Sequence, residues 1–113
     1  MDSPPLHLIC LCAAWCGTCR DYAAVMDALR AEFPALRFSW VDVEDQADLV
    51  DPVDINDFPT LLITRDGQPV FFGILRPQAD ALRRLIQSQL ADMPAPLTDA
   101  DAVGLAQRLR DLL

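Results

Sequence analysis

The segment AAWCGTCR, Ala13 to Arg20, contains two of the chain's four cysteines, separated by two residues and directly preceded by a tryptophan. A C-x-x-C pair can be a redox-active dithiol, half of a metal site or a structural disulfide. The motif alone does not decide among these, because its chemistry depends on the structure that carries it. The secondary structure predicted for the flanking residues is therefore needed to choose among them.

A short strand is predicted before the pair and a helix after it. Leu6 to Cys12 is an apolar run that is too short for a helix and is predicted to be a buried strand. After the pair, apolar residues recur at steps of three and four and form one helical stripe: Cys19, Tyr22, Met26, Leu29 and Phe33. Pro34 is expected to end this helix. A C-x-x-C pair between a strand and a helix is a much stronger redox signal than the bare motif.

The middle of the chain predicts further strands. Leu36 to Val43 is rich in aromatic and β-branched residues and is expected to be the second strand. Thr60–Thr64 and Val70–Gly73, joined by a turn at Asp66-Gly67, form a predicted hairpin. A strand–helix–strand unit suggests a parallel pair, and the hairpin adds antiparallel strands, which gives a mixed sheet of about four strands in an α/β fold.

Two helices are predicted after the hairpin. Pro77 suits the first turn of one, whose apolar face is Leu82, Leu85, Ile86 and Leu90. A proline-containing linker follows, and TDAD (98–101) matches a capping box for a last helix from about Asp99 to Leu112. The apolar stripe of that helix is expected to dock on the domain through Leu105, Leu109 and Leu112. We therefore expect one domain over residues 1–91, and over 92–113 a linker and an amphipathic helix docked on it.

Composition excludes several classes of function. The chain has 113 residues, 52% of them hydrophobic, so it can bury a core without disulfides or a metal. Its net charge is -8, which argues against nucleic acid and anionic membrane surfaces as partners. The acidic run from Asp42 to Asp57 is expected to be a solvated connection. No convincing secretion signal or span of about 20 apolar residues is present, so we expect a cytoplasmic protein.

The four cysteines suggest distinct roles. At the start of the helix, free N–H groups and the helix dipole would stabilise a Cys16 thiolate, which makes Cys16 the expected nucleophile. Cys19, one turn later, would face inward and resolve a mixed disulfide formed at Cys16. Cys10 and Cys12 point to one face of their strand. We favour two buried apolar residues there, but a second thiol pair coupled to the first and a four-cysteine metal site remain alternatives.

Together these residues resemble the thioredoxin family over roughly Leu6 to Leu90. WCGTC (15–19) resembles its active-site motif, FPT (58–60) its cis-proline loop, and RDGQPVFFG its closing hairpin. The resemblance implies a thioredoxin fold, a central sheet flanked by helices, here with an extra C-terminal helix. It implies that a substrate segment pairs with the backbone around the cis proline. The implied substrate-binding residues are Trp15, Phe58, Pro59, Thr60 and Gly73.

The chain also departs from that family. Thr18 stands where the family usually has proline. Cys10 occupies the place of a buried aspartate, and Trp40 that of the lysine that partners it. The polar pair associated with proton removal from the resolving cysteine is thus absent. Trp40 is expected in the core, and His7 has no ligand-spaced partner and is expected to be structural or exposed.

The expected function is that of a thiol–disulfide oxidoreductase acting on protein substrates. The resemblance implies that a reductase or a partner dithiol supplies electrons, with no bound cofactor and no metal. The alternative is a thioredoxin-like binding or scaffold module without significant redox turnover, favoured by the missing polar pair and the bulky Phe58. A metal sensor using all four cysteines is a third possibility.

Overall fold

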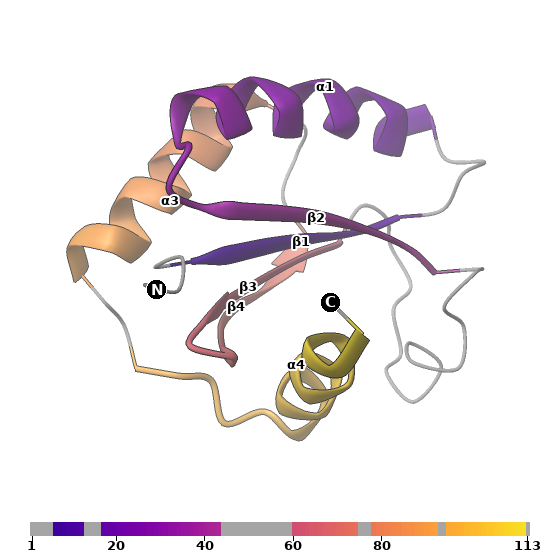
Figure 1. The fold of residues 1–113 in the computed structure, drawn as a ribbon, viewed down its shortest axis with the longest axis vertical. Coiled ribbons are helices and arrows are strands. Elements are labelled where there is room, and N and C mark those ends of the chain that lie inside the picture. Colours follow the sequence, from indigo (N-terminus) through magenta and orange to yellow (C-terminus); the bar gives the residue numbers. More distant parts are fainter. Residues whose placement is uncertain (1–5, 13–16, 44–59, 75–77, 93–94, 113) are drawn as a thin grey trace.

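The computed structural model describes residues 6–12, 17–43, 60–74, 78–92 and 95–112, and of residues 17–19, 111 and 112 the backbone alone. Along these ranges the elements are β1 (His7–Cys12), α1 (Gly17–Glu32), β2 (Arg37–Asp42), β3 (Thr60–Arg65), β4 (Gln68–Ile74), α3 (Ala79–Asp92) and α4 (Ala100–Leu112), as Figure 1 shows. The order predicted from the sequence is confirmed. Most of the acidic run and Pro77 lie outside the described residues.

The strands form one mixed sheet in the order β2-β1-β3-β4 (Figure 1). β1 pairs in parallel with β2 and antiparallel with β3, and β3 pairs antiparallel with β4. This is the mixed four-stranded sheet that the sequence predicts. β1 therefore has a strand on each side, and five of its six residues are buried. A strand covered on both faces is apolar throughout, which explains the unbroken run LICLC.

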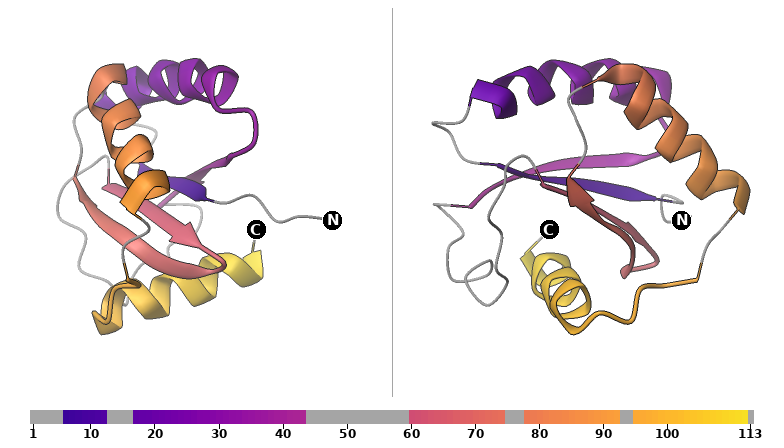
Figure 2. Two further views of the ribbon diagram at one scale, coloured as in Figure 1. Left: turned by 90° about the vertical axis from the view of Figure 1, so that its left-hand side faces the viewer. Right: turned by 180° about the vertical axis from the view of Figure 1, so that it is seen from behind.

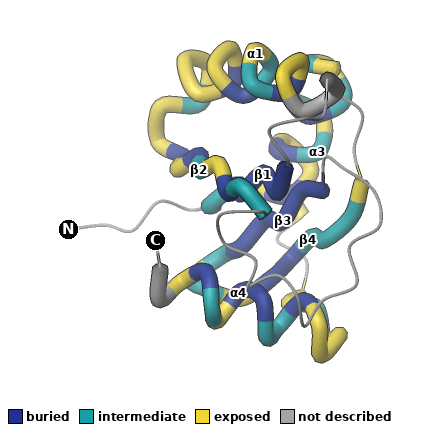
Figure 3. The backbone as a smooth tube through the Cα atoms, turned by 90° about the vertical axis from the view of Figure 1, so that its right-hand side faces the viewer, coloured by how far each residue is buried: buried dark blue, intermediate teal, exposed yellow. Residues whose placement is uncertain are grey.

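Helices cover both faces of the sheet. α1 and α3 lie over one face and α4 lies over the other, as the two views of Figure 2 show. Successive side chains of a strand point to opposite faces. Leu8, Cys10 and Cys12 accordingly join the core under α1 and α3, whereas Ile9 and Leu11 join a second core with Leu62, Leu105 and Leu109. β1 and β3, which lie between the two helical layers, are largely dark blue in Figure 3 because nearly all their residues are buried.

Local signals fix the ends of several elements. Asp66 and Gly67 both have positive φ, 54° and 80°, as the two central residues of a type I′ hairpin turn require. The Ala102 N–H donates to Asp99 Oδ2 at 3.1 Å, so Asp99 caps α4. The cap is thus one residue later than the start of the predicted capping box. Arg83 on α3 bridges to Glu32 at the end of α1 at 2.6 Å.

Two predicted core residues are exposed. Trp40 is 41% exposed, because β2 is an edge strand and has a neighbouring strand on one side only. Leu90 is 38% exposed, whereas Gln89 is buried with Leu82 and Ile86. The buried stripe of α3 thus follows positions i, i+4 and i+7 and passes beside Leu90. No helix of the described residues is long and apolar enough to span a membrane.

Truncation of Leu109 should test the packing of α4 on the sheet. Leu109 is fully buried, so Leu109→Ala should lower the free energy of unfolding by about 2–5 kcal/mol. The matched control is Leu90→Ala, a half-exposed helical leucine, for which we expect a loss of about 1 kcal/mol or less. Urea unfolding of both variants measures the difference. Equal losses would contradict a packed α4.

Candidate functional site

The C-x-x-C motif lies at the junction of β1 and α1. β1 ends at Cys12 and α1 begins at Gly17, the residue that follows Cys16 in the sequence. Cys19 lies within the first turn of α1, and its side chain is outside the described part. The strand predicted before the motif and the helix predicted after it are confirmed. Trp15 and Cys16 themselves lie outside the described residues.

Two of the predicted substrate-binding residues lie at the same edge of the sheet as the end of β1. Thr60 begins β3, is buried, and is the register partner of Leu11 on β1 and of Ile74 on β4. Gly73 pairs with Leu61, one residue further along β3. The end of β1, the start of β3 and the end of β4 therefore meet at one edge. Phe58 and Pro59 directly precede Thr60 and lie outside the described residues.

Ile74 is a candidate contact that the sequence does not single out. It is 58% exposed, although it is a large apolar residue, and it lies opposite Thr60 at this edge. A single exposed apolar side chain is common on protein surfaces, so Ile74 is a candidate only because of its position at this edge. The hydrophobic periodicity of the sequence could not identify Ile74, because this residue continues the apolar run of β4. It is exposed because it is the last residue of that strand.

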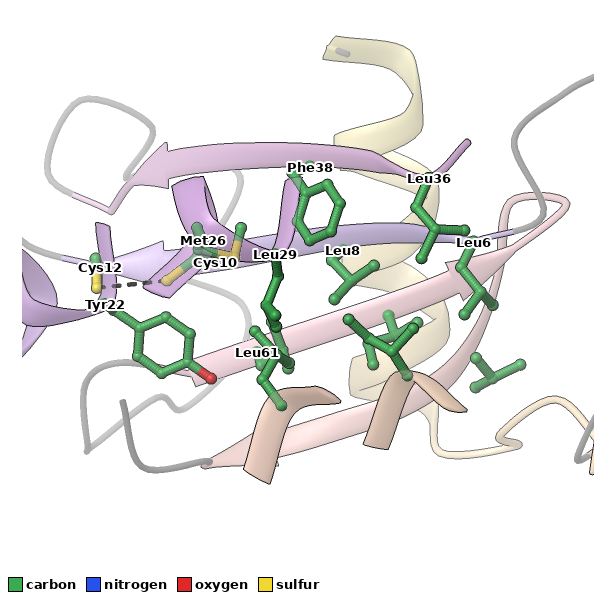
Figure 4. Packing of buried hydrophobic residues seen from close by; sticks show 14 residues of the cluster. Leu6, Leu8, Cys10, Cys12, Tyr22, Met26, Leu29, Leu36, Phe38 and Leu61 are labelled. Atoms are coloured by element: carbon green, nitrogen blue, oxygen red, sulfur yellow. Dashed lines mark hydrogen bonds between the residues drawn. The ribbon is translucent and has the colours of Figure 1, made fainter. Parts of the chain in front are cut away.

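Behind the junction, Cys10 and Cys12 point to the same face of β1, toward α1 (Figure 4). Both are fully buried, and their Sγ atoms are 3.7 Å apart. Cys10 is a free thiol, whereas Cys12 is disulfide-bonded. The expectation of two merely buried apolar residues is therefore right about their burial and wrong for Cys12, which carries a covalent bond.

The surroundings of Cys10 keep its thiol protonated. Burial raises the pKa of Cys10 from its usual 9.0 to about 12. Tyr22 from α1 packs in the same core, and its hydroxyl has no hydrogen-bond partner among the described residues. Burial, and then the neighbouring Cys10, raise the pKa of Tyr22 as well. Figure 4 shows Tyr22 and Met26 beside the two sulfurs.

The positions of the missing polar pair are in fact neighbours. Cys10 on β1 is the register partner of Trp40 on β2. Neither side chain is ionised at neutral pH, since Trp40 has no titratable group and the pKa of Cys10 is far above 7. The structure therefore has two uncharged residues where the resemblance points to a carboxylate and an amine. Among the described residues no three histidine, cysteine or acidic side chains are grouped so that they could hold a metal ion.

His7 lies at the other end of β1 from the cysteines. Its Nε2 is 2.6 Å from Ser39 Oγ on β2, and the ring is partly buried. Burial, and then the positive charge of Arg37, lower the pKa of His7 from 6.5 to about 4. His7 is thus a neutral structural residue that ties β1 to β2, as the sequence suggests.

Comparison with known proteins identifies the family. The thioredoxin family model matches residues 1–88. A thioredoxin of Chlamydia trachomatis serovar D is 32% identical over 81 residues, which are 72% of this chain and 79% of that protein. An H-type thioredoxin of Picea mariana is 30% identical over 107 residues, 95% of this chain and 82% of that protein.

Solved structures agree with the sequence relatives. The crystal structure of thioredoxin from Trypanosoma brucei brucei is similar with a TM-score of 0.69 and 25% identity, over 81% of this chain and 80% of that one. The X-ray structure of Fasciola hepatica thioredoxin is similar with a TM-score of 0.66 and 28% identity, over 75% of this chain and 81% of that one. The architecture is therefore the thioredoxin fold, an α/β sheet flanked by helices.

The chain belongs to the thioredoxin family. It is a thiol–disulfide oxidoreductase, and as an enzyme it is a protein-disulfide oxidoreductase. Thioredoxins act in general on protein disulfides and are served by reductases, so these are the kinds of partner that the family defines.

The low pKa of His7 has a consequence for stability. The unfolded chain takes up a proton near pH 6.5, but the folded chain does so only near pH 4. Stability is therefore lost as the pH falls from 6.5 toward 4. Urea midpoints across this range should fall less steeply for His7→Gln, which keeps a hydrogen-bonding group for Ser39 and cannot ionise. Because the carboxylates titrate in both proteins, identical slopes would show that His7 does not contribute.

Proposed function

We propose that Cys16 is the attacking cysteine and Cys19 the resolving cysteine of this oxidoreductase. The observation that carries the proposal is the start of α1 at Gly17, directly after Cys16. The free N–H groups and the dipole of a 16-residue helix favour an anion at this end. The first turn of α1 contains no acidic residue that would oppose a thiolate. These features lower the pKa expected for a thiol at position 16.

The reaction proceeds in two exchanges. The Cys16 thiolate attacks one sulfur of a substrate disulfide, whose S–S bond breaks, and the released substrate thiolate takes up a proton. The Cys19 thiolate then attacks Cys16 Sγ in the mixed disulfide and displaces the second substrate sulfur as a thiolate. The substrate gains two electrons and two protons, and the chain ends with a Cys16–Cys19 disulfide. A reductase or a partner dithiol restores the dithiol, without a cofactor bound to this chain.

We propose that the substrate binds as an extended segment and pairs with the backbone of the residues that precede β3. The resemblance assigns Trp15, Phe58 and Pro59 to this platform, together with Thr60 and Gly73. The meeting of Thr60, Gly73 and the end of β1 at one sheet edge supports this assignment. Backbone pairing with such an edge accepts many sequences, because it uses main-chain groups common to all substrates. The exposed Ile74 adds an apolar contact.

The second exchange should be slow near neutral pH. By the resemblance, Cys10 stands where the family has a carboxylate that assists proton removal from the resolving cysteine. A thiol with a pKa of about 12 is a poor base at pH 7. Since only a thiolate attacks a disulfide, resolution by Cys19 should accelerate toward alkaline pH.

We further propose a cytoplasmic location and no nucleic-acid or membrane partner. The net charge of -8 disfavours both polyanionic surfaces. A reducing compartment favours a catalytic over a structural role for a C-x-x-C pair. The division into a thioredoxin-like domain over residues 1–91 and an added linker and helix over 92–113 is likewise our proposal.

Substitution of each motif cysteine tests the assignment. Cys16→Ser should lower the rate of insulin disulfide reduction by a factor of about a thousand or more, to the uncatalysed rate. Cys19→Ser should also stop turnover, but it should accumulate a mixed disulfide with the substrate, which non-reducing electrophoresis detects. Mixed disulfides in Cys16→Ser rather than in Cys19→Ser would reverse the two roles. A wild-type protein without reductase activity would favour the binding module.

The residue between the cysteines should tune the reduction potential. Thr18 lies in the first turn of α1, where its backbone N–H has no partner within the helix and can stabilise the Cys16 thiolate. Stabilising the reduced form raises the potential, which we expect between about -270 and -120 mV. Thr18→Pro removes this donor and should make the protein more reducing.

Equilibration with glutathione buffers measures the potentials. Thr18→Ala keeps the N–H group and is the matched control, so its potential should stay near that of the parent. A Thr18→Pro variant no more reducing than Thr18→Ala would refute the role of the donor.

A further inference from the structure

A free thiol lies directly against a disulfide sulfur inside this protein. Cys10 Sγ and Cys12 Sγ are 3.7 Å apart on one face of β1, and the dashed line in Figure 4 joins them. Cys10 is reduced and Cys12 is disulfide-bonded. A thiol in contact with one sulfur of a disulfide is the starting arrangement of a thiol–disulfide exchange.

We propose that Cys10 and Cys12 form a second dithiol/disulfide couple that exchanges an electron pair with the C-x-x-C motif within the same chain. The proposal rests on the proposed function, in which that motif is the redox-active pair. The chain has four cysteines. Besides Cys10 and Cys12 these are Cys16 and Cys19, so the exchange that we propose for Cys12 is with a cysteine of the motif.

The exchange balances within one molecule. The Cys10 thiolate attacks Cys12 Sγ, a Cys10–Cys12 bond forms, and the bond from Cys12 to its present partner breaks. The displaced sulfur leaves as a thiolate and takes up the proton that Cys10 has lost. Cys10 and Cys12 are then oxidised and the motif is fully reduced, so the electron pair has moved to the motif without an external reductant. The reverse exchange returns it.

The burial of both sulfurs favours an internal route for the electrons. Cys10 and Cys12 are both 0% exposed, so an external thiol cannot reach either sulfur in the folded protein. Cys12 is the last residue of β1 and lies four positions before Cys16, beside the junction that carries the motif. Cys10 lies two residues before Cys12 and is therefore farther from the end of the strand. Electrons therefore reach Cys10 through Cys12.

The backbone allows the new bond. Alternate residues of a strand are about 6.6 Å apart at Cα, and disulfides span Cα separations of about 4.4–6.8 Å. The two sulfurs must approach from 3.7 Å to a bond length of about 2 Å, which rotation about the side-chain bonds can supply in part. The Cys10–Cys12 disulfide should thus form at the upper limit of the usual range.

The groups around Cys10 predict a slow exchange. Tyr22 from α1 is the titratable neighbour, and the register partners of Cys10 on β2 and β3 are Trp40 and Leu61. The acidic Asp42 is the register partner of Cys12. None of these supplies a positive charge, and burial raises the pKa of Cys10 to about 12. The thiolate fraction, and with it the rate, should rise about tenfold for each pH unit above neutrality.

The test counts and locates disulfides in the full-length protein. The chain is equilibrated with glutathione buffers of increasing potential, quenched with acid, unfolded, alkylated and weighed. Wild type should pass from four alkylated cysteines to two and then to none. Cleavage by chymotrypsin after Leu11 and Trp15 separates the peptides and should show Cys10 joined to Cys12. A chain that retains alkylated Cys10 at every potential would overturn the proposal.

Two variants control the result. Cys10→Ala, or Cys10→Ser if the alanine variant is unstable, should lose the second oxidation step and keep one alkylated cysteine under oxidising conditions. In Cys12→Ala, Cys10 should stay alkylated at every potential, because its acceptor is gone. Oxidation of Cys10 in Cys12→Ala would mean that Cys10 reacts without Cys12, and would refute the couple.

The same samples separate this proposal from the proposed function. Insulin reduction by a wild-type protein whose Cys10 is never oxidised would overturn the second couple and leave the motif as the active site. A Cys10–Cys12 disulfide in a protein that does not reduce insulin would support the second couple and overturn the proposed function.

Discussion

The structure depends on the burial of β1 between two cores. From Leu8 to Cys12 its side chains alternate between the core under α1 and α3 and the core under α4, and all five are buried. This constraint fixes where β1 ends and where α1 begins. The end of β1, which precedes the C-x-x-C motif in the sequence, thereby lies at the edge where β3 starts and β4 ends. The same burial places two cysteines behind the motif, in surroundings that oppose ionisation.

α4 covers one face of the sheet, although it lies beyond residue 88, where the match to the family model ends. Ile9, Leu11 and Leu62 would present an apolar sheet face to water without a cover, and Leu105 and Leu109 supply it. Further contacts hold α4 and the segment before it to the hairpin. Leu97 N–H donates to Pro69 O at 2.7 Å, and a Cβ on Gly67 would lie 2.8 Å from Arg110 Nη1. The described part of the chain thus builds both layers from its own helices.

Local signals predicted most of the fold, and tertiary position decided what they could not. The apolar run of β1, the stripe of α1 and the Asp66-Gly67 turn each act within a few residues, so periodicity and turn chemistry identify them. The exposure of Trp40 depends on the place of β2 at the sheet edge, which composition does not reveal. The disulfide of Cys12 could not be foreseen either, since C-x-C spacing does not determine which sulfurs meet.

The pairing of Cys10 with Trp40 joins stability to redox chemistry. A carboxylate at position 10 would be fully buried beside an indole that offers no positive charge, and an unpaired buried charge is costly. A thiol avoids that cost because it stays protonated, but it then cannot serve as a base near neutral pH. Position 10 therefore lacks a group that accepts a proton near neutral pH and has instead a sulfur in contact with Cys12. The exchange of electrons proposed for Cys10 and Cys12 would thus take the place of proton transfer by a carboxylate at this position.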